Sequence, residues 1–375
     1  MTPAAGVAVL AVNAGSSSVK LALFRVGPTG EAECWRSQVD GPAGSAPDLA
    51  GVATQLDHLG LPRPTAVGHR VVHGGSAHTR PEVVDDDVLA QLEALVPFAP
   101  LHQPAALAGI RAARRAWPDL VQVACFDTAF HRTLAPDAYT LALPPSVRDA
   151  GVRRYGFHGL SYEYVVGHLA DEQPGRTVIA HLGSGASLCA VADGRSVDTT
   201  MGFTPTGGVV MGTRPGDLDP GVLVHLLRHP PPDMTPDADG LEDLLDRRSG
   251  LLGLSGRSND VRTLLEARAA GDEASALALA VFARTAAKQV AALATAVGGL
   301  DTLVFTAGIG ERSAEVRAEI CAPLAFLGIE IDADANRVGA DVISTPGGVT
   351  VRVVPTDEER MIARHTATVV AAATG

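Results

Sequence analysis

Runs of consecutive apolar residues alternate with periodic helical patterns in the first half of the chain. Residues 7–12 are apolar, end in a tip of small polar residues, and are followed directly by a second strand-like run at 19–26. Apolar runs of this length predict buried strands, so the pair predicts a hairpin. The other elements predicted in this half are strands at 65–68 and 120–126 and helices around 86–95 and 104–117.

The same organisation restarts near Asp149. Residues 177–182 predict a buried strand that again ends in a small-residue tip, and a strand at 188–192 follows the tip. Asp193 and Gly194 predict a hairpin turn before a further strand. The elements expected from there on are a strand at 195–199, a helix at 272–297, a strand at 302–306, a glycine turn at 307–310, a helix from about 313, a strand at 349–354 and a helix at 358–373.

The pattern of strand, small-residue tip and strand therefore occurs near the start of each half. This repeat predicts an α/β fold of two duplicated domains, each aiming its tip into a central cleft. A chain of 375 residues is long enough to form two cores of ordinary size. We expect an N-terminal domain at 1–150, with a C-terminal helix at about 361–375 packing back on it, and a second domain at 151–360.

The net charge and the spacing of the cysteines indicate which binding partners and which cellular compartment to expect. The formal net charge is −12, from 30 basic and 42 acidic residues. An acidic chain repels nucleic acid and anionic membranes, so we expect neither as a partner. The first apolar run is short and has no basic residue before it, which is unlike a signal peptide or a membrane span. Four scattered cysteines without metal-ligand spacing predict buried thiols in a reducing cytoplasm.

Residues 13–20, Asn-Ala-Gly-Ser-Ser-Ser-Val-Lys, are a candidate phosphate-binding tip. Small residues let backbone N–H groups approach an anion, the hydroxyls add donors, and Lys20 adds positive charge. The Gly-Lys-Ser/Thr ending and the following helix of a P-loop are both missing. A plain polar hairpin tip is the alternative interpretation.

Two arginines lie in loops that suit an anionic ligand. Arg70 follows the strand at 65–68 and precedes a Gly-Gly turn, while Arg214 lies in the rigid Gly/Pro loop at 212–220. The donor and the acceptor of a phosphoryl group are both anionic, so two arginines from different halves would neutralise the group during transfer. An ordinary surface arginine is the alternative for Arg70.

Other positions are candidates for catalysis or metal binding. Asp127 follows the strand at 120–126, where it could anchor a magnesium-bound water or an arginine, or simply cap a helix. His158 lies in a glycine-flanked turn at the predicted domain junction, although a lone histidine is more often structural. Glu358 opens the last helix, where acidic residues are favoured anyway, and it could help to place Mg²⁺. The turn at 308–310 would let the backbone lie against a base or an α-phosphate.

Five longer motifs, taken together, resemble the acetate kinase family, which belongs to the superfamily of sugar kinases and actin. The similarity runs from about residue 7 to about residue 369. The motifs are Asn-x-Gly-Ser-Ser-Ser-x-Lys, Gly-His-Arg-Val-Val-His-Gly-Gly, Phe-Asp-Thr-Ala-Phe-His, Tyr-Gly-Phe-His-Gly and Gly-Thr-Arg-x-Gly-Asp-x-Asp-Pro. The resemblance implies two duplicated actin-like, ribonuclease-H-like domains, a cytoplasmic homodimer, ATP or ADP as cosubstrate, and Mg²⁺ as cofactor with Mn²⁺ as an alternative.

The resemblance also implies a role for each matching residue. The implied magnesium positions are Asn13 and Glu358, and the implied catalytic positions are Arg70, Asp127, His158 and Arg214. The implied acid-binding positions are Arg70, Val72, Leu101, Phe157 and Pro205. The implied nucleotide-binding positions are Lys20, His181, Leu182, Gly183, Ser184, Gly185, Asp260, Val261, Arg262, Gly308, Ile309, Gly310, Glu311 and Arg312.

Three positions depart from the family pattern. The family usually has Asn at the positions of Ser184, Arg312 and Asp357. The first two lie in the nucleotide segments, so they bear on base preference and nucleotide affinity. The third departure leaves Glu358 in place, and none of the three affects the paired arginines.

The implied activity is reversible transfer of the γ-phosphoryl group of ATP to acetate. A carboxylate is ionised at neutral pH and needs no general base, which suits a motif set rich in arginine and glycine better than a sugar acceptor would. Propionate and butyrate are alternative acceptors, because one methylene in an apolar pocket changes specificity by only about 1–3 kcal/mol. A nucleotide-binding protein of the same fold without activity is a further alternative.

Overall fold

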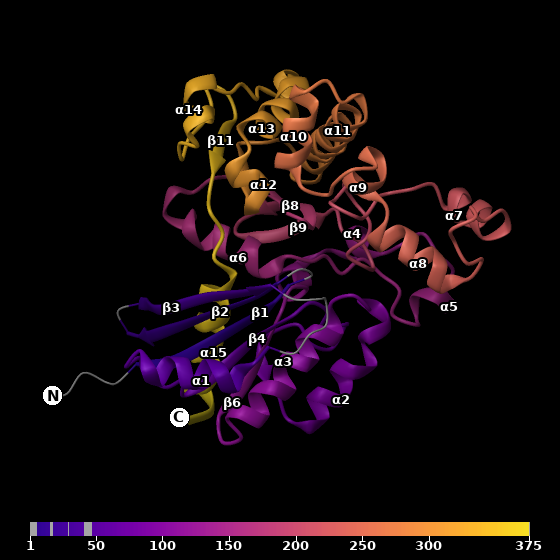
Figure 1. The fold of residues 1–375 in the computed structure, drawn as a ribbon. Helices are drawn as coiled ribbons and strands as arrows, with labels where there is room; N and C mark the ends of the chain where they lie inside the picture. Colours follow the sequence, from indigo (N-terminus) through magenta and orange to yellow (C-terminus); the bar gives the residue numbers. More distant parts are fainter. Residues whose placement is uncertain (1–5, 16–17, 29, 41–46, 375) are drawn as a thin grey trace. The chain divides into compact units, whose positions relative to one another are not determined.

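The computed structural model describes residues 6–15, 18–28, 30–40 and 47–374, which form two compact units (Figure 1). The first unit comprises Met1–Arg132, Phe157–Tyr164 and Asp357–Gly375. The second comprises Thr133–Gly156 and Val165–Thr356. Residues 133–156 thus belong to the second unit, although the expected boundary lies at 150. Where independently folding domains begin and end stays a prediction.

The first unit contains a mixed six-stranded sheet with the order β3-β2-β1-β4-β6-β5. Its strands are β1 (Val7–Ala14), β2 (Ser18–Gly27), β3 (Gly30–Asp40), β4 (Ala66–Val71), β5 (Glu82–Val83) and β6 (Val121–Phe126). β1 and β2 form the expected antiparallel hairpin, and β1, β4 and β6 run parallel. β3 was not predicted, because this edge strand is rich in polar residues and has no continuous apolar run.

Helices cover both faces of this sheet, and alternate residues of β1 contact them. Leu10 and Val12 belong to a core with α1 (Leu49–His58) and α3 (Gln103–Ala116), while Ala11 and Val9 face α15 (Glu358–Thr374). This alternation follows from the two-residue period of a strand. The predicted helix at 86–95 is confirmed as α2 (Asp86–Ala94), and α15 packs on the sheet as Figure 1 shows.

The second unit repeats the arrangement of the first. Its strands are β7 (Thr177–Leu182), β8 (Ala186–Ala192), β9 (Arg195–Thr199), β10 (Thr302–Thr306) and β11 (Thr350–Val353). The order β9-β8-β7-β10-β11 matches β3-β2-β1-β4-β6, with an antiparallel meander followed by two parallel strands. The predicted α/β fold of two duplicated domains is therefore confirmed.

The long helix α11 (Glu273–Ala296) packs on the sheet of the second unit. In the described part of the chain it is the one helix with the length and hydropathy of a membrane span. Its buried side, which includes Leu279, Phe282 and Val290, packs against β7, β8 and neighbouring helices, as expected for the core helix of a globular unit. The predicted glycine turn at 307–310 is instead the first turn of α12 (Ala307–Arg312), which precedes α13 (Ala314–Cys321).

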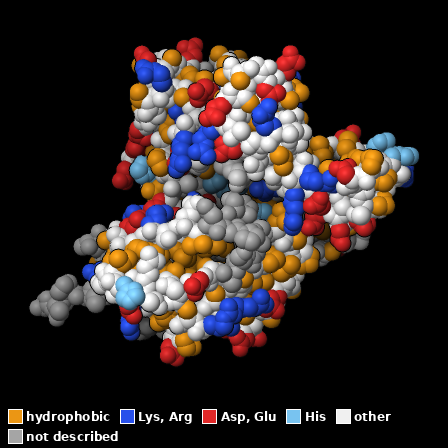
Figure 2. Space-filling model, viewed as in Figure 1, with side chains coloured by type: hydrophobic (Ala, Val, Ile, Leu, Met, Phe, Trp, Pro, Cys, Tyr) orange, Lys and Arg blue, Asp and Glu red, His pale blue; other side chains and the backbone are white. Residues whose placement is uncertain are grey.

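The remaining helices are α4 (Pro136–Tyr139), α5 (Pro145–Arg148), α6 (Gly159–His168), α7 (Pro220–Arg228), α8 (Ala238–Arg247), α9 (Gly250–Ser255), α10 (Val261–Ala269) and α14 (Ala333–Val338). On the face drawn in Figure 2, basic and acidic side chains are interspersed. Exposed ion pairs of the described residues include Arg63 with Asp57 and Arg176 with Asp301. That the chain binds no nucleic acid or membrane stays a prediction.

Candidate functional site

Three of the predicted site residues lie at the carboxyl edge of the parallel strands in the first unit. Asn13 is near the end of β1, Arg70 is near the end of β4, and Asp127 directly follows β6. The strand register places Arg70 beside Cys125, and the Asp127 N–H donates to the carbonyl of Val71 over 3.0 Å. Ligands of α/β folds bind at this edge of the sheet, so the strand order itself brings the three side chains together.

Arg70 and Asp127 form a buried ion pair at this edge. The Nε and Nη2 groups of Arg70 donate to Oδ2 of Asp127 over 2.9 and 2.6 Å, and Nη1 donates to Oδ1 of Asn13 over 3.2 Å. The Asp127 side chain is fully buried, and that of Arg70 is 11% exposed. A guanidinium has five N–H donors, and these bonds use three, so Arg70 keeps donors for an anion.

Both members of this pair are charged at neutral pH. Burial raises the pKa of Asp127 from 3.8 to about 6, although the charge and hydrogen bonds of Arg70 oppose the shift. Burial lowers the pKa of Arg70, but the charges of Asp127 and Glu358 outweigh it, so its net shift is upward. The carboxyl of Asp127 therefore has a pKa above that of an ordinary aspartate, and burial is the main cause.

The first turn of α15 is joined to the same cluster through Asn13. The Nδ2 group of Asn13 donates to Oε2 of Glu358 over 2.8 Å and to Oε1 of Glu359 over 2.6 Å. Glu359 also accepts from Nη1 of Arg36. Asn13 thus connects two carboxylates from the C-terminal helix with the guanidinium of Arg70.

The oxygen atoms of this cluster fit a Mg²⁺ ion that is held mainly by phosphates and water. Oδ1 of Asp127 is buried and has no hydrogen-bond partner among the described residues, so it could accept from a metal-bound water. Mg²⁺ prefers oxygen ligands and often takes only one or two carboxylates from a protein. In the described ranges no three His, Cys, Asp or Glu side chains are grouped to hold a metal by themselves. Asn13, as it is oriented here, already uses its oxygen for Arg70.

His158 lies next to this cluster in a backbone conformation that is uncommon outside glycine. Its φ is 58°, in the left-handed region, and its side chain is buried. The following residue, Gly159, donates its N–H to the Asp127 carbonyl over 2.9 Å, and a Cβ at Gly159 would lie 2.1 Å from that oxygen. A left-handed non-glycine residue persists only where its surroundings fix it. The turn therefore holds His158 against the Asp127 segment.

The residues expected around the acid's methyl group are divided between the two units. Val72 and Phe157 are buried in the first unit, where the ring of His73 meets Phe157 edge-on at 5.4 Å. Leu101 is half-buried before α3 in the same unit, while Pro205 belongs to the second unit. That these residues line one acid pocket stays a prediction.

Arg214 lies in a loop of the second unit that is fixed by hydrogen bonds. Its Nη1 donates to the carbonyl of Pro205 over 2.6 Å, and its own carbonyl accepts from the N–H of Met211 over 2.9 Å. Further along the loop, Asp217 and Gly208 exchange two hydrogen bonds of 2.7 and 2.9 Å. The arginine is buried, as expected for a positioned rather than a solvated side chain.

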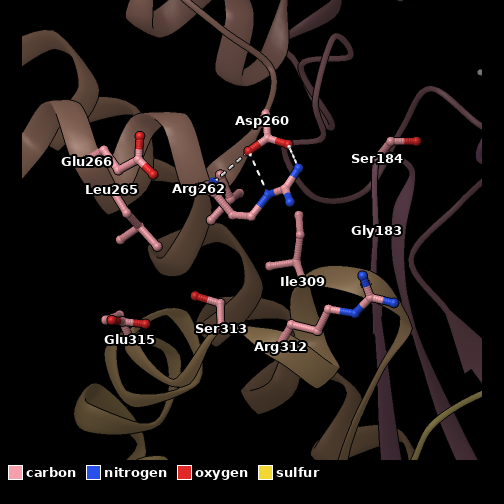
Figure 3. A pocket seen from close by; sticks show the side chains of 12 residues that line it. Gly183, Ser184, Asp260, Arg262, Leu265, Glu266, Ile309, Arg312, Ser313 and Glu315 are labelled. Atoms are coloured by element: carbon pink, nitrogen blue, oxygen red, sulfur yellow. Dashed lines mark hydrogen bonds and ion pairs between the residues drawn. The ribbon is translucent and has the colours of Figure 1, made fainter.

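Most of the predicted nucleotide segments line one cavity of about 480 Å³ in the second unit (Figure 3). The predicted residues that line it are Gly183, Ser184, Asp260, Val261, Arg262, Gly308, Ile309 and Arg312. The others lie elsewhere: His181 and Leu182 are buried in β7, Gly185, Gly310 and Glu311 adjoin lining residues, and Lys20 is exposed on β2 in the first unit. Part of the predicted phosphate-binding tip, residues 16 and 17, lies outside the described residues.

Four lining residues were not predicted from the sequence. Leu265 and Glu266 lie four positions after Val261 and Arg262 on α10, a spacing that places them on the same helix face. Ser313 directly follows α12, and Glu315 lies in the first turn of α13. The helical spacing on α10 was the signal that could have found the first pair.

The charged side chains of the cavity differ in how they are held. Arg262 folds back on Asp260, with a 2.9 Å ion pair that lowers the pKa of Asp260. In Figure 3, Arg312 instead extends toward the side of the cavity lined by Gly183 and Ser184. Arg312 thus supplies positive charge beside the small-residue tip, where phosphates are expected to bind.

The fully buried Arg317 holds the end of α12 in place. Its Nη1 donates to the carbonyls of Gly310 and Glu311, both over 2.9 Å, while Nε and Nη2 donate to Oδ1 and the carbonyl of Asn336 over 2.8 and 2.7 Å. Burial lowers the pKa of Arg317. Because α12 carries three lining residues, this arginine supports the wall of the cavity.

We expect Arg317→Met to lower the free energy of unfolding by about 2–4 kcal/mol, because it leaves several buried acceptors without donors. Urea unfolding followed by circular dichroism measures the change. Arg337→Met is the matched control, since Arg337 is exposed and forms a surface ion pair with Asp334. The control should stay within about 0.5 kcal/mol of wild type. Equal losses in both variants would contradict the prediction.

The sequence matches a family model over most of its length and many known proteins over nearly its full length. The model described as the acetokinase family matches residues 58–364. An acetate kinase of Rhodopseudomonas palustris is 44% identical over 95% of this chain and 97% of the relative. An acetate kinase of Pseudarthrobacter chlorophenolicus is 45% identical over 96% of this chain and 98% of the relative.

Solved structures agree with the sequence matches. A propionate kinase from Francisella tularensis superposes with a TM-score of 0.87 at 36% identity, covering 96% of this chain and 99% of that one. The acetate kinase of Porphyromonas gingivalis superposes with a TM-score of 0.82 at 36% identity, covering 97% of this chain and all of that one. The chain belongs to the acetokinase family.

Proposed function

We propose that this protein is an acetate kinase, which transfers the γ-phosphoryl group of ATP reversibly to acetate and yields acetyl phosphate and ADP. Membership of the acetokinase family and full-length similarity to acetate kinases support the activity. The observation that carries the proposal is the Arg70–Asp127 pair at the carboxyl edge of the parallel strands, with Asn13 and the first turn of α15 beside it. This arrangement presents a fixed guanidinium to an anionic substrate.

The chemistry needs alignment and charge neutralisation rather than a general base. Acetate is ionised at neutral pH, so its oxygen attacks the γ-phosphorus directly while ADP leaves on the opposite side. Arg70 binds the acid and the transferred group, and Asp127 keeps the guanidinium oriented through two hydrogen bonds. Arg214 and His158 stabilise the charge that spreads over the phosphoryl oxygens.

Magnesium completes this charge balance in the proposal. Glu358 and Asn13 would hold the ion, with Asp127 accepting from its water, and when bound it neutralises the nucleotide phosphates. Arg70 and Arg214 belong to different units, so the proposal requires both to reach one phosphoryl group during turnover. The proposal also includes a cytoplasmic homodimer, ATP as the donor, and Mn²⁺ as an alternative metal. It includes no nucleic-acid or membrane partner.

Propionate is the second candidate acid, because the Francisella tularensis structure that superposes well is a propionate kinase. Butyrate and a non-catalytic nucleotide-binding role are less well supported. The apolar residues expected around the methyl group, Val72 and Phe157, suit a short acid. Discrimination against one extra methylene is limited to about 1–3 kcal/mol, so activity with propionate should accompany activity with acetate.

The first test is acyl-hydroxamate formation from ATP, Mg²⁺ and hydroxylamine with acetate, propionate or butyrate as the acid. A product with acetate at least as strong as with propionate would support the proposal. If only a longer acid gives strong product, that acid replaces acetate as the proposed substrate, and the proposed mechanism is unchanged. No product with any acid, from folded protein that binds ATP, would overturn the proposed activity.

We expect Ser184→Asn to lower the KM for ATP about two- to tenfold, the effect of one added hydrogen bond to the nucleotide. Ser184 is exposed at the cavity wall, and its carbonyl is already fixed by the N–H of Gly212 over 3.1 Å, so a longer amide can reach a ligand without disturbing the tip. Kinetic constants for ATP, GTP and pyrophosphate measure the change, with the KM for acetate as the internal control. Unchanged constants across all three donors would refute the prediction.

A further inference from the structure

We propose that Asp246, on α8, is a positioning residue that holds the arginine loop in the geometry needed for phosphoryl transfer. The arginine loop is defined here as residues 204–217, which include both Pro205 and Arg214. Asp246 contacts Thr206, which follows Pro205, and Thr213, which precedes Arg214. The inference rests on the proposed role of Arg214 and adds a residue that none of the sequence motifs contains.

Asp246 closes a ring of hydrogen bonds through the arginine loop. The Thr206 hydroxyl donates to Oδ1 of Asp246 over 2.7 Å, and the Thr213 hydroxyl donates to the carbonyl of Asp246 over 2.7 Å. Between them, Nη1 of Arg214 donates to the carbonyl of Pro205 over 2.6 Å. One residue therefore fixes both the segment that carries the guanidinium and the segment that carries its acceptor.

The backbone on either side of Arg214 is packed tightly against Gly250. Gly250, at the start of α9, has φ of 63°, and a Cβ there would lie 2.2 Å from the carbonyl oxygen of Met211 and 2.8 Å from both N and O of Arg214. The Ser249 N–H also donates to the carbonyl of Thr213 over 3.0 Å. These contacts hold the main chain of the loop. We infer that the hydrogen bonds of the Thr206 and Thr213 side chains then set the direction of the Arg214 guanidinium.

The chemistry explains why such a ring matters for this site. A guanidinium that stabilises a phosphoryl group must be in place before the reaction, because a displacement of about 1 Å can lower the rate a hundredfold. Asp246 acts without contacting the substrate, through the neutral Thr206 hydroxyl and the Pro205 carbonyl. Its carboxylate is half-buried, and Glu242, four positions earlier on the same helix, carries a nearby like charge.

The test compares Asp246→Ala and Thr206→Val with the conservative variants Asp246→Asn and Thr206→Ser. We expect both disruptive variants to lower kcat about 10- to 100-fold with the KM for ATP within about twofold of wild type. The conservative variants keep the acceptor or the donor and should retain most of the turnover. Asp243→Ala is the matched control, since Asp243 lies on the same helix and pairs with Arg248 instead.

A double-mutant cycle separates positioning from a general loss of stability. In an Arg214→Ala background, Asp246→Ala should lower kcat less than about twofold further, because the group it positions is gone. The inference would be overturned if Asp246→Ala lowered kcat by the same factor in both backgrounds. It would also be overturned if the wild-type protein were active and Asp246→Ala kept normal turnover. Lack of activity in the wild type would instead overturn the proposed function.

A readout without turnover tests the placement of Arg214 directly. Modification of Arg214 by phenylglyoxal, followed by peptide mass spectrometry, should be about two- to tenfold faster in Asp246→Ala and Thr206→Val, the effect of one lost hydrogen bond on local opening. The rate in Asp243→Ala should equal the wild-type rate. Equal modification rates in all variants would overturn the inference even if the enzyme used another substrate.

Discussion

We expect Arg214→Ala to lower kcat for acetyl phosphate formation by about a hundredfold or more, as loss of a charge-stabilising donor does in other enzymes. Arg214 is buried and its guanidinium donates to the Pro205 carbonyl over 2.6 Å, so its side chain is held in one position. Steady-state kinetics with the hydroxamate readout measures the loss. Arg214→Lys should recover only part of it, because an ammonium group lacks the planar fork of a guanidinium.

The control for this variant is Arg284→Ala, which removes an exposed arginine from α11 in the same unit. It should keep wild-type turnover. Circular dichroism and thermal unfolding establish that Arg214→Ala is folded. A folded variant with near-normal turnover would mean that Arg214 does not act on the transferred group, and the proposed mechanism would then lose one of its two arginines.

The sequence located the strands that are buried on both faces, because nearly every residue in them is apolar. The expected strand at 177–182 coincides with β7, and the run at 120–126 differs from β6 by one residue. Polar edges gave no such signal: β3 carries exposed Glu33 and Arg36, whose role becomes clear only through the pairing of Arg36 with Glu359. Tertiary contacts of this kind join positions more than three hundred residues apart, which no local pattern reports.

The sequence also predicted only part of the candidate site. Residues at strand ends, such as Asp127 and Arg70, could be named because parallel strands place their carboxyl ends at one edge. Their partners could not be named from spacing. The hydrogen bonds of Asn13 to the first turn of α15, and the position of Asp246 behind the arginine loop, both depend on how distant segments pack.

We also expect Asp127→Asn to lower kcat by about a hundredfold or more, because it removes the charge that orients Arg70 and leaves a buried guanidinium without its carboxylate. Asparagine keeps the size of the side chain and one acceptor for Arg70, so the change tests charge rather than volume. The kcat values of wild type and variant between pH 5 and 8.5 measure the effect. Asp87→Asn, at an exposed position on α2, is the control and should behave as wild type.

The pH profile makes this prediction specific to Asp127. Since burial raises its pKa to about 6 and the mechanism uses the ionised form, wild-type kcat should fall as pH decreases below about 6, and the variant should lack this limb. Stability has the opposite dependence. A carboxyl whose pKa is raised on folding stabilises the protein below about pH 4, and this contribution is lost as pH rises through about 6. If wild-type kcat falls below about pH 6 while the protein remains as stable as at neutral pH, the fall is due to protonation of Asp127. The same fall of kcat in Asp127→Asn would assign it to another group.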